Sequence, residues 1–169
     1  MKKLFILLFV MFNLSVVTFA QSTATAVTSA TVITPIAINK ITDLNFGTLA
    51  VSSVSAGTIV MSPSSSNTRT PSGGVTLPNV TGTVTAAKFT VTGLGTSTYA
   101  ITLPGTITLN GTPSGTMTVS SFTSTPSGTG ALVGGTQDIY VGATLNVTAA
   151  QPAGTYTNAA DLAVTVNYN

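Results

Sequence analysis

Apolar and polar residues alternate with a period of two near the C-terminal end of the chain. Over residues 139–147, apolar Ile, Val, Ala, Leu and Val occupy every second position, with Tyr, Gly, Thr and Asn between them. Residues 162–168 repeat this pattern. Their apolar positions are Leu162, Val164, Val166 and Tyr168. A period of two is typical of a strand with one buried face, and the turn-rich residues 151–154 separate the runs, so the sequence predicts a β-hairpin over residues 138–169.

Shorter alternating runs precede this hairpin and are separated by clusters of Gly, Pro, Ser and Asn. We predict strands at residues 36–46, 58–62, 75–77, 81–92, 99–103, 107–109, 117–122 and 131–133. Residues 63–74 are predicted as a polar loop, whereas Asn110-Gly111 is typical of a tight hairpin turn. No 3.6-residue period persists long enough for a helix after residue 20. The pattern therefore predicts an all-β fold, and we favour an antiparallel β-sandwich over a barrel.

The start of the chain has a different pattern. Lysines at positions 2 and 3 are followed by an unbroken apolar run, residues 4–12, and by small residues up to Ala20. This order is typical of a secretory signal peptide, which we assign to residues 1–20. The alternative is an uncleaved membrane anchor, but polar residues interrupt the run before it reaches spanning length. We therefore predict export through the inner membrane to the periplasm, then to the cell surface or medium, with no transmembrane helix in the mature chain.

Cleavage after Ala20 would leave a mature chain with a formal net charge of zero. Its charged side chains are Lys40, Arg69, Lys88, Asp43, Asp138 and Asp161. Nucleic-acid binding depends on clustered Lys and Arg, so we expect no nucleic-acid partner. A neutral surface also gives little electrostatic protection against self-association, which suits a subunit that polymerises.

The side chains needed for most enzyme chemistry are missing. The chain contains no His, Cys, Glu or Trp, which excludes Ser-His-Asp and Cys-His nucleophiles and sites that need imidazole or thiolate ligands. A carboxylate pair of the glycosidase type would have to come from Asp43, Asp138 and Asp161, each at the edge of a β run. We therefore predict no catalytic residue, no metal site and no cofactor, and a protein that is not an enzyme.

Four stretches of the mature chain together resemble a known family. They are Thr42-Asp43-Leu44-Asn45-Phe46-Gly47-Thr48-Leu49, Tyr140-Val141-Gly142-Ala143-Thr144-Leu145, Gln151-Pro152-Ala153-Gly154-Thr155-Tyr156 and the Val-Thr-Val-Asn-Tyr ending. On these the chain is similar to the secreted bacterial domain-of-unknown-function family 4402 over nearly its whole mature length. More distantly, its early Asn-Phe-Gly and Tyr-ended last strand resemble spore-coat-U-like and chaperone–usher pilin subunits. That resemblance implies an immunoglobulin-like antiparallel β-sandwich that lacks one strand.

The pilin resemblance also implies how the missing strand is supplied. In such fibres a neighbour's N-terminal extension fills the groove, which a periplasmic chaperone fills before assembly at an outer-membrane usher. It implies a sandwich domain at residues 36–169, preceded by a donor extension at residues 21–35. The donor residues would be Val27, Val32 and Ile33. The acceptor strand, which the chaperone first pairs with, would carry Leu162, Val164, Val166 and Tyr168.

Two functions from different classes follow. The first is a non-enzymatic secreted structural protein, a subunit of a fimbrium-like bacterial surface fibre or coat that associates with itself or with related subunits. The second is a monomeric exported binding module, for a glycan or for surface adhesion, whose own N-terminal strand completes its sandwich. Pairing of residues 24–33 within their own chain would favour the second function.

Overall fold

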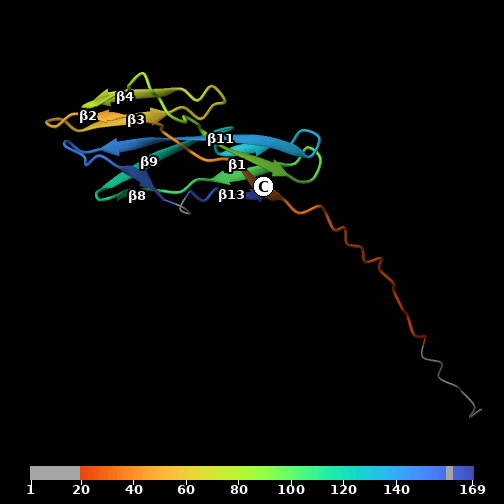
Figure 1. The fold of residues 1–169 in the computed structure, drawn as a ribbon. Coiled ribbons are helices and arrows are strands. Elements are labelled where there is room, and N and C mark those ends of the chain that lie inside the picture. Colours follow the sequence, from red (N-terminus) through yellow and green to blue (C-terminus); the bar gives the residue numbers. More distant parts are fainter. Residues whose placement is uncertain (1–19, 159–161) are drawn as a thin grey trace, which may run out of the picture. The chain divides into compact units, whose positions relative to one another are not determined.

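The computed structural model describes residues 20–158 and 162–169. The chain divides into two units, Met1–Val32 and Ile33–Asn169, and every described strand belongs to the second unit, called the body below (Figure 1). No described residue is helical, so this part of the chain has no helix that could cross a membrane. The predicted signal peptide, residues 1–20, lies outside the described residues except for Ala20.

Thirteen strands are present in the described residues. They are β1 (Ala37–Thr42), β2 (Ala50–Val51), β3 (Gly57–Met61), β4 (Arg69–Gly73), β5 (Val75–Thr76), β6 (Ala87–Thr92), β7 (Thr98–Thr102), β8 (Ile107–Thr112), β9 (Thr116–Thr125), β10 (Thr129–Ala131), β11 (Thr136–Val147), β12 (Thr155–Thr157) and β13 (Thr165–Tyr168). Their pairings are antiparallel. The all-β antiparallel fold predicted from the alternation is confirmed.

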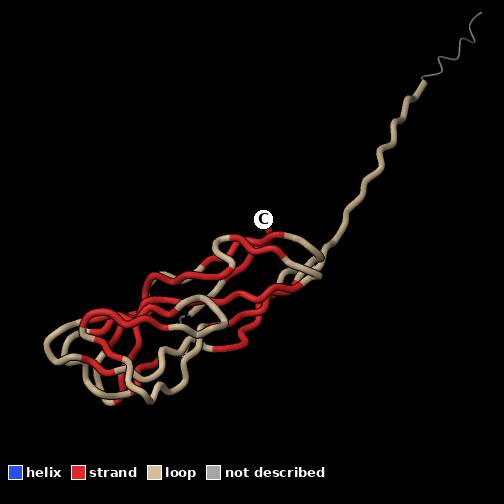
Figure 2. Tube along the Cα trace, turned by 90° about the horizontal axis from the view of Figure 1, so that it is seen from above, coloured by secondary structure: helices blue, strands red, loops and turns tan. Residues whose placement is uncertain are grey.

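The long strand β11 is the centre of the largest sheet, whose strand order is β1-β6-β11-β9-β8-β12. Along one edge of β11, residues 136–141 pair with β6 and residues 144–147 pair with β3, which also pairs with β4. Strand β9 pairs along the opposite edge. A three-stranded sheet of order β10-β7-β13 and a short pair, β2 and β5, are the other two sheets. Figure 2 shows that the described residues form strands and loops and no helix. One strand therefore connects both halves of the large sheet.

Two apolar clusters follow one another along β11. The first cluster consists of Phe46, Ile59, Met61, Val75, Ala86, Ile107, Met117, Val119, Ala143, Leu145 and Val147. The second cluster consists of Ala87, Phe89, Val91, Tyr99, Leu132, Ile139, Val141 and Val166. Two sheets face each other across the second cluster, whereas the large sheet curls into a half-barrel around the first (Figure 1). The sequence analysis favoured a sandwich over a barrel, whereas the largest sheet of the body is curled into a half-barrel.

Strand β9 changes its inward face partway along its length. Met117 and Val119 point into the first cluster, but beyond an irregularity in the pairing with β11 the inward positions become Phe122 and Ser124. Ser121 has a positive φ of 52° at this point, and the extra residue is that of a β-bulge. Phe122 consequently packs against both clusters.

Residues 138–169 do not form the predicted hairpin. Strand β11 pairs with β3, β6 and β9, whereas β13 pairs with β7 in the three-stranded sheet. Strand β12, which lies between them in the sequence, pairs with β8. The alternation correctly predicted the buried face of β11, but a period of two carries no information about which strand lies alongside. The last strand is therefore on the opposite side of the second cluster from β11.

The predicted loop at residues 63–74 is wrong as well, because it contains strand β4. Pro71 lies in the middle of this strand, opposite Ile59 of β3. Proline has no N–H to donate, and it is tolerated here because β3 is the single partner of β4 among the described strands. A proline that argues against a central strand does not argue against an edge strand.

The tight turn expected at Asn110-Gly111 lies elsewhere. Both residues belong to β8, and the chain reverses over residues 112–115, where the Gly111 N–H donates to the Gly115 carbonyl at 2.8 Å. A Cβ atom at Gly111 would lie 2.4 Å from the Ser114 carbonyl oxygen, which belongs to this reversal, and 2.6 Å from a ring carbon of Tyr156. The glycine is therefore required both by the reversal and by the close packing of the Tyr156 ring.

Candidate functional site

The first and last strands of the body each have one unpaired edge. Strand β1 pairs with β6 at the end of the large sheet, and β13 pairs with β7 at the end of the three-stranded sheet. Neither has a second ladder partner among the strands that the structure describes. An unpaired edge presents N–H and C=O groups to which another strand can be added. These two edges, called the free edges below, are the candidate site.

Strand β13 and the residues before it contribute side chains to the second cluster. Val166 is buried there, and three part-buried side chains pack against it: Leu162, Val164 and Tyr168. The Asn169 N–H donates to the Thr98 carbonyl of β7. Alternate residues of an antiparallel strand bond to the same neighbour, so the backbone groups of Val166 and Tyr168 face the free edge. The four residues predicted for an acceptor strand therefore all contact one core.

Tyr168 also holds the beginning of β1 in place. Its hydroxyl donates to the Thr34 carbonyl at 3.0 Å and accepts from the Leu94 N–H at 2.6 Å. A Cβ atom on Gly93 would lie 2.3 Å from this hydroxyl, so any larger residue there would displace the end of the tyrosine side chain. The sequence pattern identified Tyr168 as a packing residue but did not indicate its hydrogen bonds. The glycine at position 93, which the tyrosine hydroxyl contacts, is the one sequence feature connected with them.

The predicted donor segment forms no strand in the structure. Residues 20–32 belong to the first unit, in which Val27 and Val32 are almost wholly exposed. Ile33 begins the body and is half-exposed. Residues 24–33 are likewise in no strand. The donor role of Val27, Val32 and Ile33 stays a prediction.

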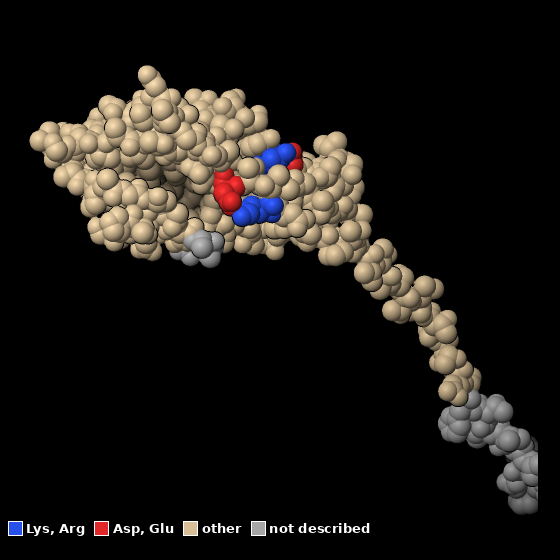
Figure 3. All heavy atoms as spheres, in the orientation of Figure 1, with Lys and Arg blue, Asp and Glu red and all other residues tan. Residues whose placement is uncertain are grey.

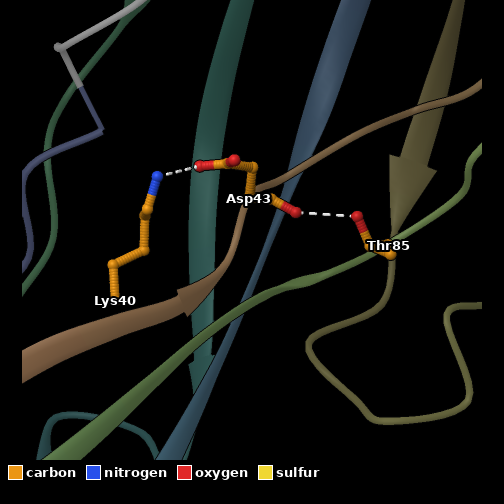
Figure 4. Close-up of polar contacts among 3 residues, drawn as sticks. All are labelled: Lys40, Asp43 and Thr85. Atoms are coloured by element: carbon orange, nitrogen blue, oxygen red, sulfur yellow. Dashed lines mark hydrogen bonds and ion pairs between the residues drawn. The ribbon is translucent and has the colours of Figure 1, made fainter.

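Four charged side chains gather on one face of the body as two ion pairs (Figure 3). Lys40 lies 2.5 Å from Asp43, and Lys88 lies 2.8 Å from Asp138. Figure 4 shows that Asp43 is held at two points, because its backbone carbonyl also accepts from the Thr85 hydroxyl at 2.7 Å. Each of these two carboxylates is therefore bound by a lysine rather than placed beside another carboxylate.

The third aspartate, Asp161, lies outside the described residues. In the described part of the chain, no three His, Cys, Asp or Glu side chains lie close enough to hold a metal ion. Arg69 donates to the carbonyls of Phe46 and Thr48, and desolvation by burial lowers the pKa of its guanidinium. Arg69 thus fixes the chain that follows β1, a structural role that the loop prediction did not anticipate.

An open hollow lies on the outer face of the curled sheet, lined in part by Thr58, Ser72, Thr118 and Asn146. Cross-strand pairing places these four side chains in one row, because Ser72 pairs with Thr58, Thr58 with Asn146 and Asn146 with Thr118. The row is uncharged and carries hydroxyl groups, while the Asn146 amide nitrogen already donates to the Thr118 carbonyl and to the Ser120 hydroxyl. Such groups can hydrogen-bond a neutral ligand, but they supply no acid, base or activated nucleophile.

The contacts of Asp138 predict a pH-dependent contribution to stability. Hydrogen bonds from Lys88 and from the Thr90 hydroxyl lower the pKa of the Asp138 carboxyl. A carboxyl with a lowered folded-state pKa stabilises the fold above its unfolded pKa, about 3.9, and this stabilisation is lost as the pH falls through the folded-state value. We expect Asp138→Asn to melt below the wild type at pH 7 and at the same temperature near pH 2. A gap in melting temperature that does not change with pH would contradict this.

One family model matches the chain, that of a domain of unknown function (DUF4402), over residues 36–168. The matched region contains β1 to β13, and with them both free edges, but not residues 21–35. No curated protein and no solved structure matches the chain. The family predicted from the four sequence stretches is thus confirmed, and its description adds no activity.

Proposed function

We propose that this chain, which belongs to the domain-of-unknown-function family DUF4402, is a non-enzymatic secreted structural subunit. It would assemble with its own copies or with related subunits into a bacterial surface fibre or coat by β-strand complementation. The observation that carries the proposal is that the first and last strands of the body both have free edges, while the uncharged residues before β1 form no strand. In this proposal the body is an incomplete immunoglobulin-like sandwich, similar to a pilin subunit.

Strand addition supplies main-chain hydrogen bonds along a free edge, and alternate side chains of the added strand fill pockets. The backbone of Val166 and Tyr168 provides such an edge. In an added strand Val27 and Ile33 would lie on one face and Val32 on the other, because successive side chains point to opposite faces. Substitutions at positions 27 and 32 therefore report on the two faces separately. A periplasmic chaperone and an outer-membrane usher are the partners that this mode of assembly implies.

The test compares matched charged substitutions in the mature chain, residues 21–169. We expect the wild type to form polymers, and Val27→Asp or Val32→Asp to reduce polymer formation at least about tenfold, because a buried aspartate in the added strand is costly. Val54→Asp and Val80→Asp are the controls, since both valines are exposed loop residues of the body. Size-exclusion chromatography and electron microscopy measure the outcome. Equal polymerisation of all five proteins, or a wild type that stays monomeric, would exclude the proposal.

A second function is favoured by the neutral hollow on the curled sheet. Its row of Thr, Ser and Asn side chains suits a monomeric exported module that binds a neutral glycan. Under this function the wild type stays monomeric, and residues 24–33 pair with their own body, whereas the structure has them in no strand. Retention on an immobilised neutral polysaccharide, lost in Thr58→Val and Thr118→Val but not in Val80→Asp, would support it over assembly.

A further inference from the structure

We infer that one end of the body is a contact surface for a second copy of this chain. The surface consists of Ile33, Leu94 and Val133, called the apolar tip below, with 51%, 40% and 75% of their surfaces exposed. The inference rests on the proposed function, in which Ile33 belongs to the added strand, and adds to it a body-to-body contact through Leu94 and Val133 that strand exchange alone does not require. Exposed apolar side chains gathered at one place on a protein commonly mark an interaction site.

Hydrogen bonds bring three segments that are distant in the sequence together at this end of the body. Leu94 lies in the loop between β6 and β7, and Val133 lies between β10 and β11. The two loops are joined because the Gly93 N–H donates to the Gly135 carbonyl at 2.9 Å and the Gly135 N–H donates to the Gly95 carbonyl at 2.7 Å. The apolar tip is thus built on two loops that hold each other.

The third residue of the apolar tip is attached through Tyr168. The tyrosine hydroxyl accepts a hydrogen bond from the Leu94 N–H and donates one to the Thr34 carbonyl. Tyr168 therefore links Leu94 to Thr34, the residue that follows Ile33. Each loop also closes on itself, with the Ser97 N–H donating to the Leu94 carbonyl and the Val133 N–H donating to the Thr136 carbonyl, both at 3.0 Å. A surface fixed in this way loses little conformational freedom when a partner binds it.

Chain connectivity identifies a second copy as the partner. Ile33 follows directly on Val32, and an extended chain advances by about 3.4 Å per residue. If residues 21–32 add to the sheet of another copy, no residue separates that added strand from Ile33 of the apolar tip. The accepting body must then approach this end of the donating body. No charged residue occurs in residues 33–35, 93–97 or 132–136, so the contact would bury no unpaired charge.

The test separates the apolar tip from strand exchange in the mature chain. We expect Leu94→Asp and Val133→Asp to weaken polymer formation at least about tenfold while leaving the monomer's melting temperature unchanged, with Val80→Asp as the control. Normal polymers of both tip variants, together with loss of polymers in Val27→Asp or Val32→Asp, would overturn this inference and leave the proposed function intact. A wild type that stays monomeric would overturn both.

A label gives a second readout that does not depend on a charged substitution. The chain has no cysteine, so a single Val133→Cys or Val80→Cys variant carries one thiol for a fluorescent label. We expect assembly to reduce the quenching of a label at position 133 by an aqueous quencher at least about threefold. The quenching of a label at position 80 should stay the same on assembly. Equal quenching at both positions in assembled protein would overturn the inference, and the apolar tip would then face a chaperone, a bilayer or solvent instead.

Discussion

Replacement of Gly142 by alanine is expected to lower the free energy of unfolding by about 3 kcal/mol, at the upper end of the cost of overpacking a core. Gly142 lies in β11 between the residues that pair with β6 and those that pair with β3. A Cβ atom at this position would lie 2.1 Å from the Met61 carbonyl oxygen and 2.8 Å from the Pro63 nitrogen. Both are backbone atoms, so neither can rotate away as the end of a flexible side chain would.

Gly105→Ala is the matched control for this substitution. Nothing lies within 4 Å of a Cβ atom at position 105. We expect the control to change the free energy of unfolding by less than about 0.5 kcal/mol, as is usual for surface positions. Urea denaturation followed by far-UV circular dichroism measures both variants. If Gly142→Ala were as stable as Gly105→Ala, the close approach of β3 to β11 would be refuted.

The faces of the strands could be predicted from the sequence, because burial on one side imposes a period of two. Phe89 and Val91 are buried while Lys88 and Thr90, which alternate with them, are part-exposed, as the alternation indicates. Ile59 in β3 follows the same rule. Successive side chains of a strand point to opposite faces whatever lies beside the strand, so the alternation of buried and exposed positions can be recognised in a single sequence.

The neighbours of the strands could not be predicted, because pairing depends on contacts distant in sequence. Nothing in residues 138–169 indicates that β13 lies beside β7 rather than β11. The bulge at Ser121 is hidden as well, since it shifts the inward face by one residue and leaves Phe122 out of phase with Val119. A period-two pattern broken by one residue looks like the end of a strand.

The candidate site was predictable only in part for the same reason. The C-terminal residues Val166 and Tyr168 were identified by their alternation, and both contact the second cluster. The free edge beside them is a property of the sheet, since it exists only because no other described strand pairs there. The bonds of Tyr168 to Thr34 and Leu94 join residues far apart in the chain, which no local pattern records.

The two apolar clusters are expected to unfold as one unit, although they lie at different places along the body. Strand β11 contributes Leu145 to the first cluster and Ile139 to the second, and Phe122 packs against both. Both β11 side chains are at most 2% exposed. Truncation of either to alanine removes buried methyl groups and leaves a cavity, a change that costs about 2–5 kcal/mol. We therefore expect Leu145→Ala and Ile139→Ala each to lower the free energy of unfolding by about 3 kcal/mol.

Shared unfolding gives a sharper result than the loss of stability alone. Strand β3 borders only the first cluster and strand β6 borders only the second. Because the continuous strand β11 crosses both clusters, a cavity in the first cluster should reduce hydrogen-exchange protection equally in β3 and in β6. Val60→Ala is the control, since Val60 lies in β3 but faces outward, and we expect a loss below about 1 kcal/mol. A second, earlier transition in Leu145→Ala, with protection lost in β3 but kept in β6, would show that the half-barrel unfolds separately. The body would then consist of two cooperative units, because β11 would not couple them.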